Sequence, residues 1–363
     1  MIKANVRIFL MACLCLLALA ACRHGEDLPV PSPEVETVQL IISVPNTVAG
    51  SRAIGDPGTA VDEGADWDRL AVILAYTDGS QVTLPGGSKV QVTTILKDDF
   101  ETLPFYNNTQ YRLLAIDAQP GKVYIYGVTY SDGVNGNPAD DISKCTTNAN
   151  VQALTISNDY TKPTDGTTID YAKFVSVATG YYKTTGNQPA KFTIQEGGTG
   201  QVGGTIPTMT LTRLAAKIDI QWDAADAYAA GYTDVKVESF SYNGKVFGRL
   251  FPDITGITIS DNKENSWTFY NNTSEISQRN GRVYHYTFPD GEIDKTTSTT
   301  TPNVTFNITA TDNNNTTTTK QYTLNFQKAL KQATWYKVNA TIKGIRGSGT
   351  ITFGDNSGTS VGG

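Results

Sequence analysis

The chain has 363 residues and a formal net charge of −6 at pH 7. Its 33 glycines, 15 prolines, 18 tyrosines and 13 phenylalanines favour strands and turns, and no segment carries a long amphipathic helical stripe. The composition therefore predicts an all-β protein. The absence of any basic cluster argues against nucleic acid as a partner.

The first segment, residues 1–21, has the features of a secretory leader. Lys3 and Arg7 precede an apolar run over Ile8–Ala21, and small residues end this run directly before Cys22. A cysteine at this place is typical of bacterial lipoproteins, in which the thiol receives diacylglycerol before the leader is cleaved. The run is shorter than the roughly 20 apolar residues of a membrane-spanning helix. We therefore predict a signal peptide, lipidation of Cys22 and attachment to the outer membrane through the lipid.

A tether and a strand follow the lipid site. Residues 22–36 contain three prolines among polar residues, which is typical of an extended tether. Thr37–Val44 then alternates in the manner of a half-buried strand. The apolar side chains that share one face of this predicted strand are Val38, Leu40, Ile42 and Val44.

A glycine-bounded loop comes directly after this strand. Arg52 lies in it between Gly50 and Gly55, in a stretch without apolar periodicity. We predict that a trypsin-like protease cuts between Arg52 and Ala53, which would remove the lipid anchor and the first strand together. The alternative is that Arg52 is an ordinary loop residue.

Short alternating segments recur along the rest of the chain, as in a β-sandwich. The predicted strands are Leu70–Tyr76, Lys89–Ile95, Tyr111–Ile116, Gly121–Tyr130, Lys191–Gln195, Thr208–Trp222, Val235–Tyr242, Lys245–Leu250, Ser266–Tyr270, Arg282–Phe288, Val304–Ala310, Gln321–Phe326 and Tyr336–Ile342. A glycine-rich stretch over residues 197–204 divides an N-terminal domain, 37–205, from a C-terminal domain, 206–363. The only helix expected is a short one between Asp223 as cap and Gly231 as stop.

No residue pattern supports catalysis or metal binding. Once the leader is lost and Cys22 is lipidated, Cys145 is the single remaining thiol, which leaves no disulfide framework. His24 and His285 are the only histidines, so we interpret Cys145 as a buried or incidental thiol. The acidic loop Asp62–Asp68 matches no known calcium loop, and no HExxH, GxSxG, CxxC or phosphate-loop motif is present. We assign no catalytic residue, no metal and no cofactor.

One predicted strand carries a row of aromatic side chains. Within Gly121–Tyr130, one face holds Tyr124, Tyr126 and Tyr130. Such rows more often serve cross-strand packing than sugar stacking.

Five features together resemble the fimbrillins of the Bacteroidetes, the subunits of protease-assembled type V pili. They are Cys22, the SRAIGDPG loop at Ser51–Gly58, the strand Lys122–Val128, LTRLAAKIDI at Leu211–Ile220 and TWYKVNATIKGIRG at Thr334–Gly347. The resemblance implies two tandem transthyretin-like β-sandwich domains. It also implies lipidated export, cleavage after an arginine, and polymerisation with other pilin subunits by strand exchange. The expected location is the outer membrane and then the extracellular fimbrium, where the subunit would meet a surface receptor.

The C-terminal tail departs from the pattern of stalk subunits in that family, which carry a long extension after the strand equivalent to Tyr336–Ile342. Here Ile351 and Phe353 are the candidate anchors of a donated strand, and two such side chains would contribute only ~3–6 kcal/mol before ordering costs. We therefore expect a tip or accessory subunit. The alternative function is a permanently anchored surface lipoprotein that binds glycans and keeps its first strand.

Overall fold

The computed structural model describes residues 37–45, 67–80, 82, 84–132, 138–157, 175–197, 205–245, 247–257, 264–271, 279–289, 302–326, 330–345, 350–353 and 360–362. All of these residues belong to one compact unit, Glu36–Gly363. Strands make up most of the described chain, which confirms the all-β prediction. Transthyretin-like topology in two tandem domains stays a prediction.

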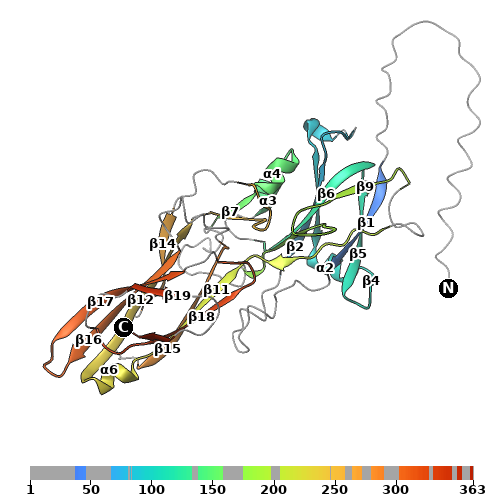
Figure 1. Ribbon diagram of the computed structural model, residues 1–363. Coiled ribbons are helices and arrows are strands. Elements are labelled where there is room, and N and C mark those ends of the chain that lie inside the picture. The colour runs from blue at the N-terminus through green and yellow to red at the C-terminus, as the bar shows by residue number, and fades with distance from the viewer. Residues whose placement is uncertain are drawn as a thin grey trace, which may run out of the picture. The chain divides into compact units, whose positions relative to one another are not determined.

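Two sheets enclose the first hydrophobic core (Figure 1). The smaller sheet has the order β1-β5-β4, with β1 at Val38–Pro45, β5 at Tyr111–Ala118 and β4 at Phe105–Tyr106. The larger sheet has the order β10-β8-β6-β2-β3, and β9 also pairs with β6. Its strands are β2 (Arg69–Tyr76), β3 (Val90–Leu96), β6 (Gly121–Tyr130), β8 (Ala178–Tyr181), β9 (Lys191–Ile194) and β10 (Thr212–Arg213).

Two further sheets enclose a core built from the C-terminal half. One has the order β15-β11-β18-β20, with β11 at Ala216–Asp223, β15 at Asn280–Thr287, β18 at Trp335–Thr341 and β20 at Ser360–Gly362. The other has the order β14-β12-β16-β17-β19, with β12 at Tyr232–Lys245, β14 at Glu264–Asn271, β16 at Asn303–Asp312, β17 at Thr317–Phe326 and β19 at Thr350–Phe353. Strands β7 (Thr155–Ser157) and β13 (Phe247–Arg249) form a separate pair.

The expectation of a single short helix is wrong. The helix at the predicted place is α6 (Ala225–Ala229), where the Asp223 carboxylate accepts a bond from the Ala225 amide at 2.8 Å. Among the described residues, three more short α-helices occur, α2 (Lys97–Glu101), α3 (Pro138–Ile142) and α4 (Asn148–Gln152). Five residues are too few to show a helical period, so only local signals such as the capping box at Thr147 mark them. No helix in the described part of the chain is long and apolar enough to cross a bilayer.

The predicted strand Thr208–Trp222 is two strands in the structure. Thr212 and Arg213 pair with β8 as β10, and a new strand, β11, begins at Ala216 in a different sheet. The phase shift visible in the sequence marks this passage, because Leu211 packs in the first core and Ala216 packs in the second. Residues after the predicted boundary at 205/206 thus still pair with β8, and the boundary itself stays a prediction.

The two C-terminal motifs that resemble fimbrillins lie on neighbouring strands. Strands β11 and β18 run parallel, with Lys217 opposite Trp335. The Lys217 side chain is fully buried, and its Nζ lies 5.5 Å from the Trp335 ring and 5.0 Å from the Tyr284 ring. Asp219, also buried, accepts bonds from Trp335 Nε1 at 3.0 Å and from Arg282 at 2.7 Å. These charges are therefore structural, since each has aromatic or ionic partners inside the sheet.

Candidate functional site: the first strand and its groove

Strand β1 lies at the edge of its sheet and pairs antiparallel with β5 along its whole length. The register places Leu40 opposite Ile116 and Ile42 opposite Leu114, so apolar side chains of both strands point to the same face. Because successive side chains of a strand alternate between faces, this register turns Ile41 to the other side.

The inward face of β1 is an integral part of the first core. Leu40, Ile42 and Val44 are each 0% exposed, and they pack with residues of the larger sheet, including Leu70. Val38 is half-buried at the beginning of the strand and packs against the same cluster. The four residues that the sequence assigns to one face do lie on one face.

The second edge of β1 also has a neighbour. The Ser43 amide donates to the carbonyl of Pro207 at 2.9 Å, and the Met209 amide donates to the carbonyl of Ser43 at 3.0 Å. Strand β1 therefore lies in a groove with two walls, β5 on one side and Pro207–Met209 on the other. Ser43 is buried, and its Oγ has no hydrogen-bond partner among the described residues.

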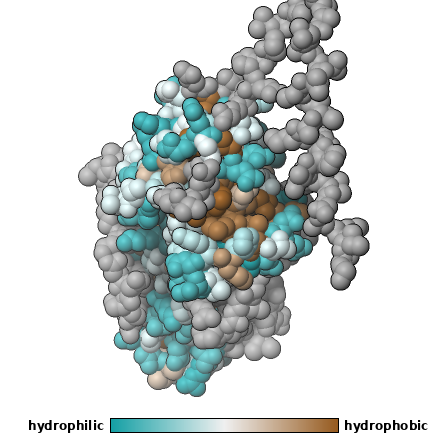
Figure 2. Space-filling model, turned by 90° about the vertical axis from the view of Figure 1, so that its right-hand side faces the viewer, coloured by the Kyte–Doolittle hydropathy of each residue, from teal (hydrophilic) through white to brown (hydrophobic). Residues whose placement is uncertain are grey.

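The outward face of the β1-β5-β4 sheet carries apolar side chains that are only partly covered. Phe105 in β4 lies opposite Arg112, on the inward face with Val44; it is 51% exposed, and the Arg112 guanidinium lies 4.1 Å from the centre of its ring. On the outward face, Ile41 and Leu113 are half-buried. Figure 2, which views the side of the molecule where β1, β4 and β5 lie in Figure 1, shows hydrophobic residues gathered on this face.

The remaining predicted site residues lie elsewhere. Cys22, Arg52 and Ala53 are outside the described residues, so lipidation and cleavage stay predictions. Ile351 and Phe353 belong to β19, which pairs in parallel with β17 and places them opposite Leu324 and Phe326.

The thiol and the tyrosine row are parts of the interior. Cys145 is buried, and burial together with the neighbouring Asp141 raises the pKa of its thiol to about 11, so it is a poor nucleophile. Tyr126 and Tyr130 are buried in the core, and Tyr126 donates a hydrogen bond to Asn148 at 2.7 Å. Tyr124 is half-buried. The packing interpretation of this row is therefore confirmed.

His285 is a buried titratable group that sequence reasoning did not assign. It lies in β15, with ring centres of Phe269 at 4.8 Å and Tyr242 at 5.1 Å. Burial lowers its pKa from the ordinary 6.5 to about 3. No signal in the sequence identifies this burial, because the neighbouring rings come from β12 and β14.

We expect His285 to make the protein less stable in mild acid. Its folded-state pKa is lower than its unfolded-state pKa, so its contribution to stability is complete above pH 6.5 and is lost as the pH falls from 6.5 towards 3. Urea denaturation between pH 7 and pH 4 measures this effect. The control is His285→Phe, which keeps an aromatic ring and should show a smaller loss than the wild type; identical pH profiles would contradict the assignment.

The fold and the buried first strand define an all-β protein whose core depends on an N-terminal strand. No family model and no curated protein matches the chain. Among solved structures, it is similar to a candidate cell adhesion protein from Bacteroides eggerthii, with 16% identity over 90% of this chain and 89% of that chain, and a TM-score of 0.47.

Two further similar structures are fimbrial proteins. The tip fimbrial protein of Porphyromonas gingivalis, truncated at its C-terminus, has 10% identity over 79% of this chain and 81% of that chain, with a TM-score of 0.38. A fimbrial assembly protein from Parabacteroides distasonis has 12% identity over 84% of this chain and 90% of that chain, with a TM-score of 0.39. The structural neighbours of the chain thus include fimbrial and adhesion proteins of the Bacteroidetes.

Proposed function

We propose that the chain is a structural and adhesive subunit of a cell-surface fimbrium, joined to other pilin subunits by strand exchange. The observation that supports this proposal is the position of β1. It is the first described strand, it lies at a sheet edge, and it fills a groove in the core with three fully buried side chains.

Loss of β1 would leave a binding site for another strand. Burial of Leu40, Ile42 and Val44 contributes ~1.5–3 kcal/mol each, or roughly 5–9 kcal/mol as an upper limit. An empty groove would expose this apolar surface together with unpaired backbone groups of β5, Pro207 and Met209. A strand from a second subunit, with apolar residues at alternate positions, would restore both the burial and the hydrogen bonds.

A single cut can separate β1 from the rest of the chain. Strand β1 ends at Pro45 and β2 begins at Arg69, and Arg52 lies between them in the sequence. Cleavage after Arg52 by a trypsin-like protease would leave β1 attached only by noncovalent contacts. In our proposal the precursor is a lipoprotein held in the outer membrane through Cys22, and the cleaved subunit passes into the extracellular fimbrium.

The pairing of the C-terminal tail favours a tip or accessory position. Strand β19 pairs with β17 and β20 pairs with β18, so both described strands of the tail add to sheets of their own chain. A stalk subunit needs a tail that is available to a neighbour. A tip subunit needs only to receive a strand, and it would present its surface to a receptor.

The N-terminus of protein recovered from the cell surface tests this function. We expect the wild type to begin at Ala53 and to enter polymers that are visible as ladders on gels. Arg52→Ala should begin at a lipidated Cys22 and remain monomeric, because β1 stays in its groove. Ser51→Ala is the matched control, since it alters the same loop, keeps the arginine and should be processed normally.

Two outcomes would contradict the proposal. One is polymerisation of Arg52→Ala at the wild-type level. The other is a wild-type surface protein that begins at Cys22 and keeps β1, which would support the permanently anchored lipoprotein instead.

A further inference from the structure

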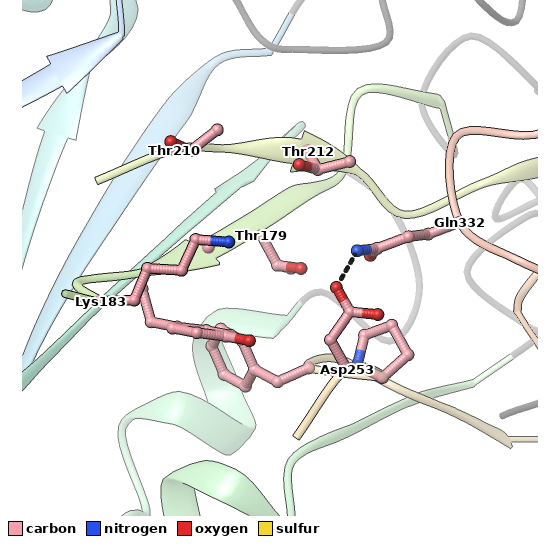
Figure 3. Close-up of a pocket in the computed structure, with 10 residues that line it drawn as sticks. Thr179, Lys183, Thr210, Thr212, Asp253 and Gln332 are labelled. Carbon is pink, nitrogen blue, oxygen red and sulfur yellow. Dashed lines mark hydrogen bonds between the residues drawn. The ribbon is translucent and has the colours of Figure 1, made fainter. Parts of the chain in front are cut away.

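The two ends of the larger sheet differ in what covers them. At one end, Thr179 of β8 and Thr212 of β10 line a hollow of about 50 Å³ together with Asp253 and Gln332. Figure 3 shows the Gln332 amide joined there to the Asp253 carboxylate by a hydrogen bond of 2.7 Å, so this end has neighbours from the C-terminal half of the chain. The strand at the other end is β3, whose only partner strand in the described part of the chain is β2.

The backbone of β3 turns hydrogen-bonding groups to its open side. Where the strand begins, the Tyr76 amide donates to the carbonyl of Lys89 at 2.8 Å. Antiparallel strands alternate between hydrogen-bonded and non-hydrogen-bonded pairs, so the odd-numbered residues of β3 bond to β2. The amides of Val92, Thr94 and Leu96 and the carbonyls of Val92 and Thr94 therefore point away from the sheet, where a neighbouring strand could bond to them.

The side chains of the same residues are exposed and lack the usual protection of a sheet edge. Val92 is 37% and Leu96 is 45% exposed, and Thr94 between them is exposed as well. Open edges of natural sheets are commonly protected by a charge, a proline or a bulge. The strand Val90–Leu96 (VQVTTIL) contains no charged residue and no proline, and its register against β2 is regular. Such an edge is expected to pair with another strand.

The charges at the two ends of β3 are opposite. Asp98 and Asp99 follow the strand at the beginning of α2, and both are exposed, while Lys97 is paired with Glu101 at 2.7 Å. Lys89 precedes the strand, and its Nζ donates to two backbone carbonyls at 3.0 and 2.9 Å, which hold this cation near the beginning of β3. An antiparallel partner with the same charges would bring its acids to Lys89 and its lysine to Asp98 and Asp99.

We propose that β3 pairs antiparallel with β3 of a second copy of this chain, about a two-fold axis at Thr94. The outward residues read apolar, threonine, apolar in both directions, so the strand is complementary to itself. In this register Val92 lies opposite Leu96 of the second copy, and the two Thr94 residues lie opposite each other. The outward backbone groups then bond across the axis, and opposite charges meet at both ends of the contact. Strand β1 takes no part, so the pairing does not rest on the proposed strand exchange.

Disulfide trapping of the uncleaved full chain, purified in detergent, tests this proposal. In the proposed register the two Thr94 Cα atoms are about 5.5 Å apart, which is within the range that a disulfide spans. Thr94→Cys should therefore form a covalent dimer under mild oxidation, visible as a band of doubled mass on a non-reducing gel. Thr93→Cys is the matched control, because its Cα atoms would be roughly 7–8 Å apart and its side chain points to the other face of the sheet. The wild type, in which Cys145 is buried, controls for native thiols.

Val92→Lys, added to Thr94→Cys, shows whether the trapped contact is this edge. A lysine brings a charge to the apolar seam, so the yield of covalent dimer should fall about tenfold. Thermal unfolding shows whether each variant is folded. If Thr94→Cys does not fold, sedimentation of the wild type and of Val92→Lys decides the question, since only the wild type should be dimeric. Equal dimer yields from Thr94→Cys and Thr93→Cys, absence of a dimer, or a dimer that survives Val92→Lys would overturn the proposal.

Discussion

Ile42→Ala is expected to lower the free energy of unfolding by about 2–5 kcal/mol, because it leaves a cavity in the core beneath β1. Ile42 is 0% exposed and lies between the two sheets of the first core. Its neighbour Ile41 provides a matched control, since it is half-buried on the opposite face of the same strand. Ile41→Ala should cost about 1 kcal/mol or less.

Urea denaturation of the two variants and the wild type measures this difference. Equal losses for Ile41→Ala and Ile42→Ala would contradict the register of β1 against β5. The difference also has a functional meaning under the proposed strand exchange, because any strand that replaces β1 must bring a comparable side chain to the position of Ile42.

Gly180→Ala is expected to destabilise the protein by about 3 kcal/mol or more, at the upper end of overpacking effects. A Cβ atom at Gly180 would lie 1.8 Å from the carbonyl oxygen of Thr210, so the backbone after Met209 could not keep its place on β8. The measurement is thermal unfolding of the variant.

Gly79→Ala is the matched control for Gly180→Ala. No atom lies within 4 Å of the position that its Cβ would take, so the same substitution should change stability by no more than about 1 kcal/mol. A wild-type melting temperature for Gly180→Ala would show that the segment after Met209 is not packed on β8 as described.

Much of the strand pattern could be predicted from the sequence, because alternation of apolar and polar residues is a local signal. Gly121–Tyr130 has the predicted bounds, and the inward face of β1 was predicted residue by residue. Strand β8 was missed because Ala178–Tyr181 contains a glycine and is buried on both faces, so no alternation is visible. Local patterns predict which face of a strand is buried and not which strand it meets.

The second wall of the groove could not be predicted for that reason. The contact between Ser43 and Met209 joins residues that lie far apart in the sequence, on both sides of the predicted domain boundary. Only the folded arrangement brings these groups together.

The segment Pro207–Arg213 connects the groove of β1 to the larger sheet of the first core. Its first part forms hydrogen bonds with β1 at Ser43, and its second part pairs with β8 as β10. The strand that fills the groove and the edge of the larger sheet therefore hold the same piece of backbone. Thermodynamic linkage requires that if exchange of β1 changes the equilibrium constant for pairing of β10 with β8 by some factor, that pairing changes the affinity for the incoming strand by the same factor. Under the proposed strand exchange, assembly of the subunit would thus be coupled to the order of the passage that leads into β11.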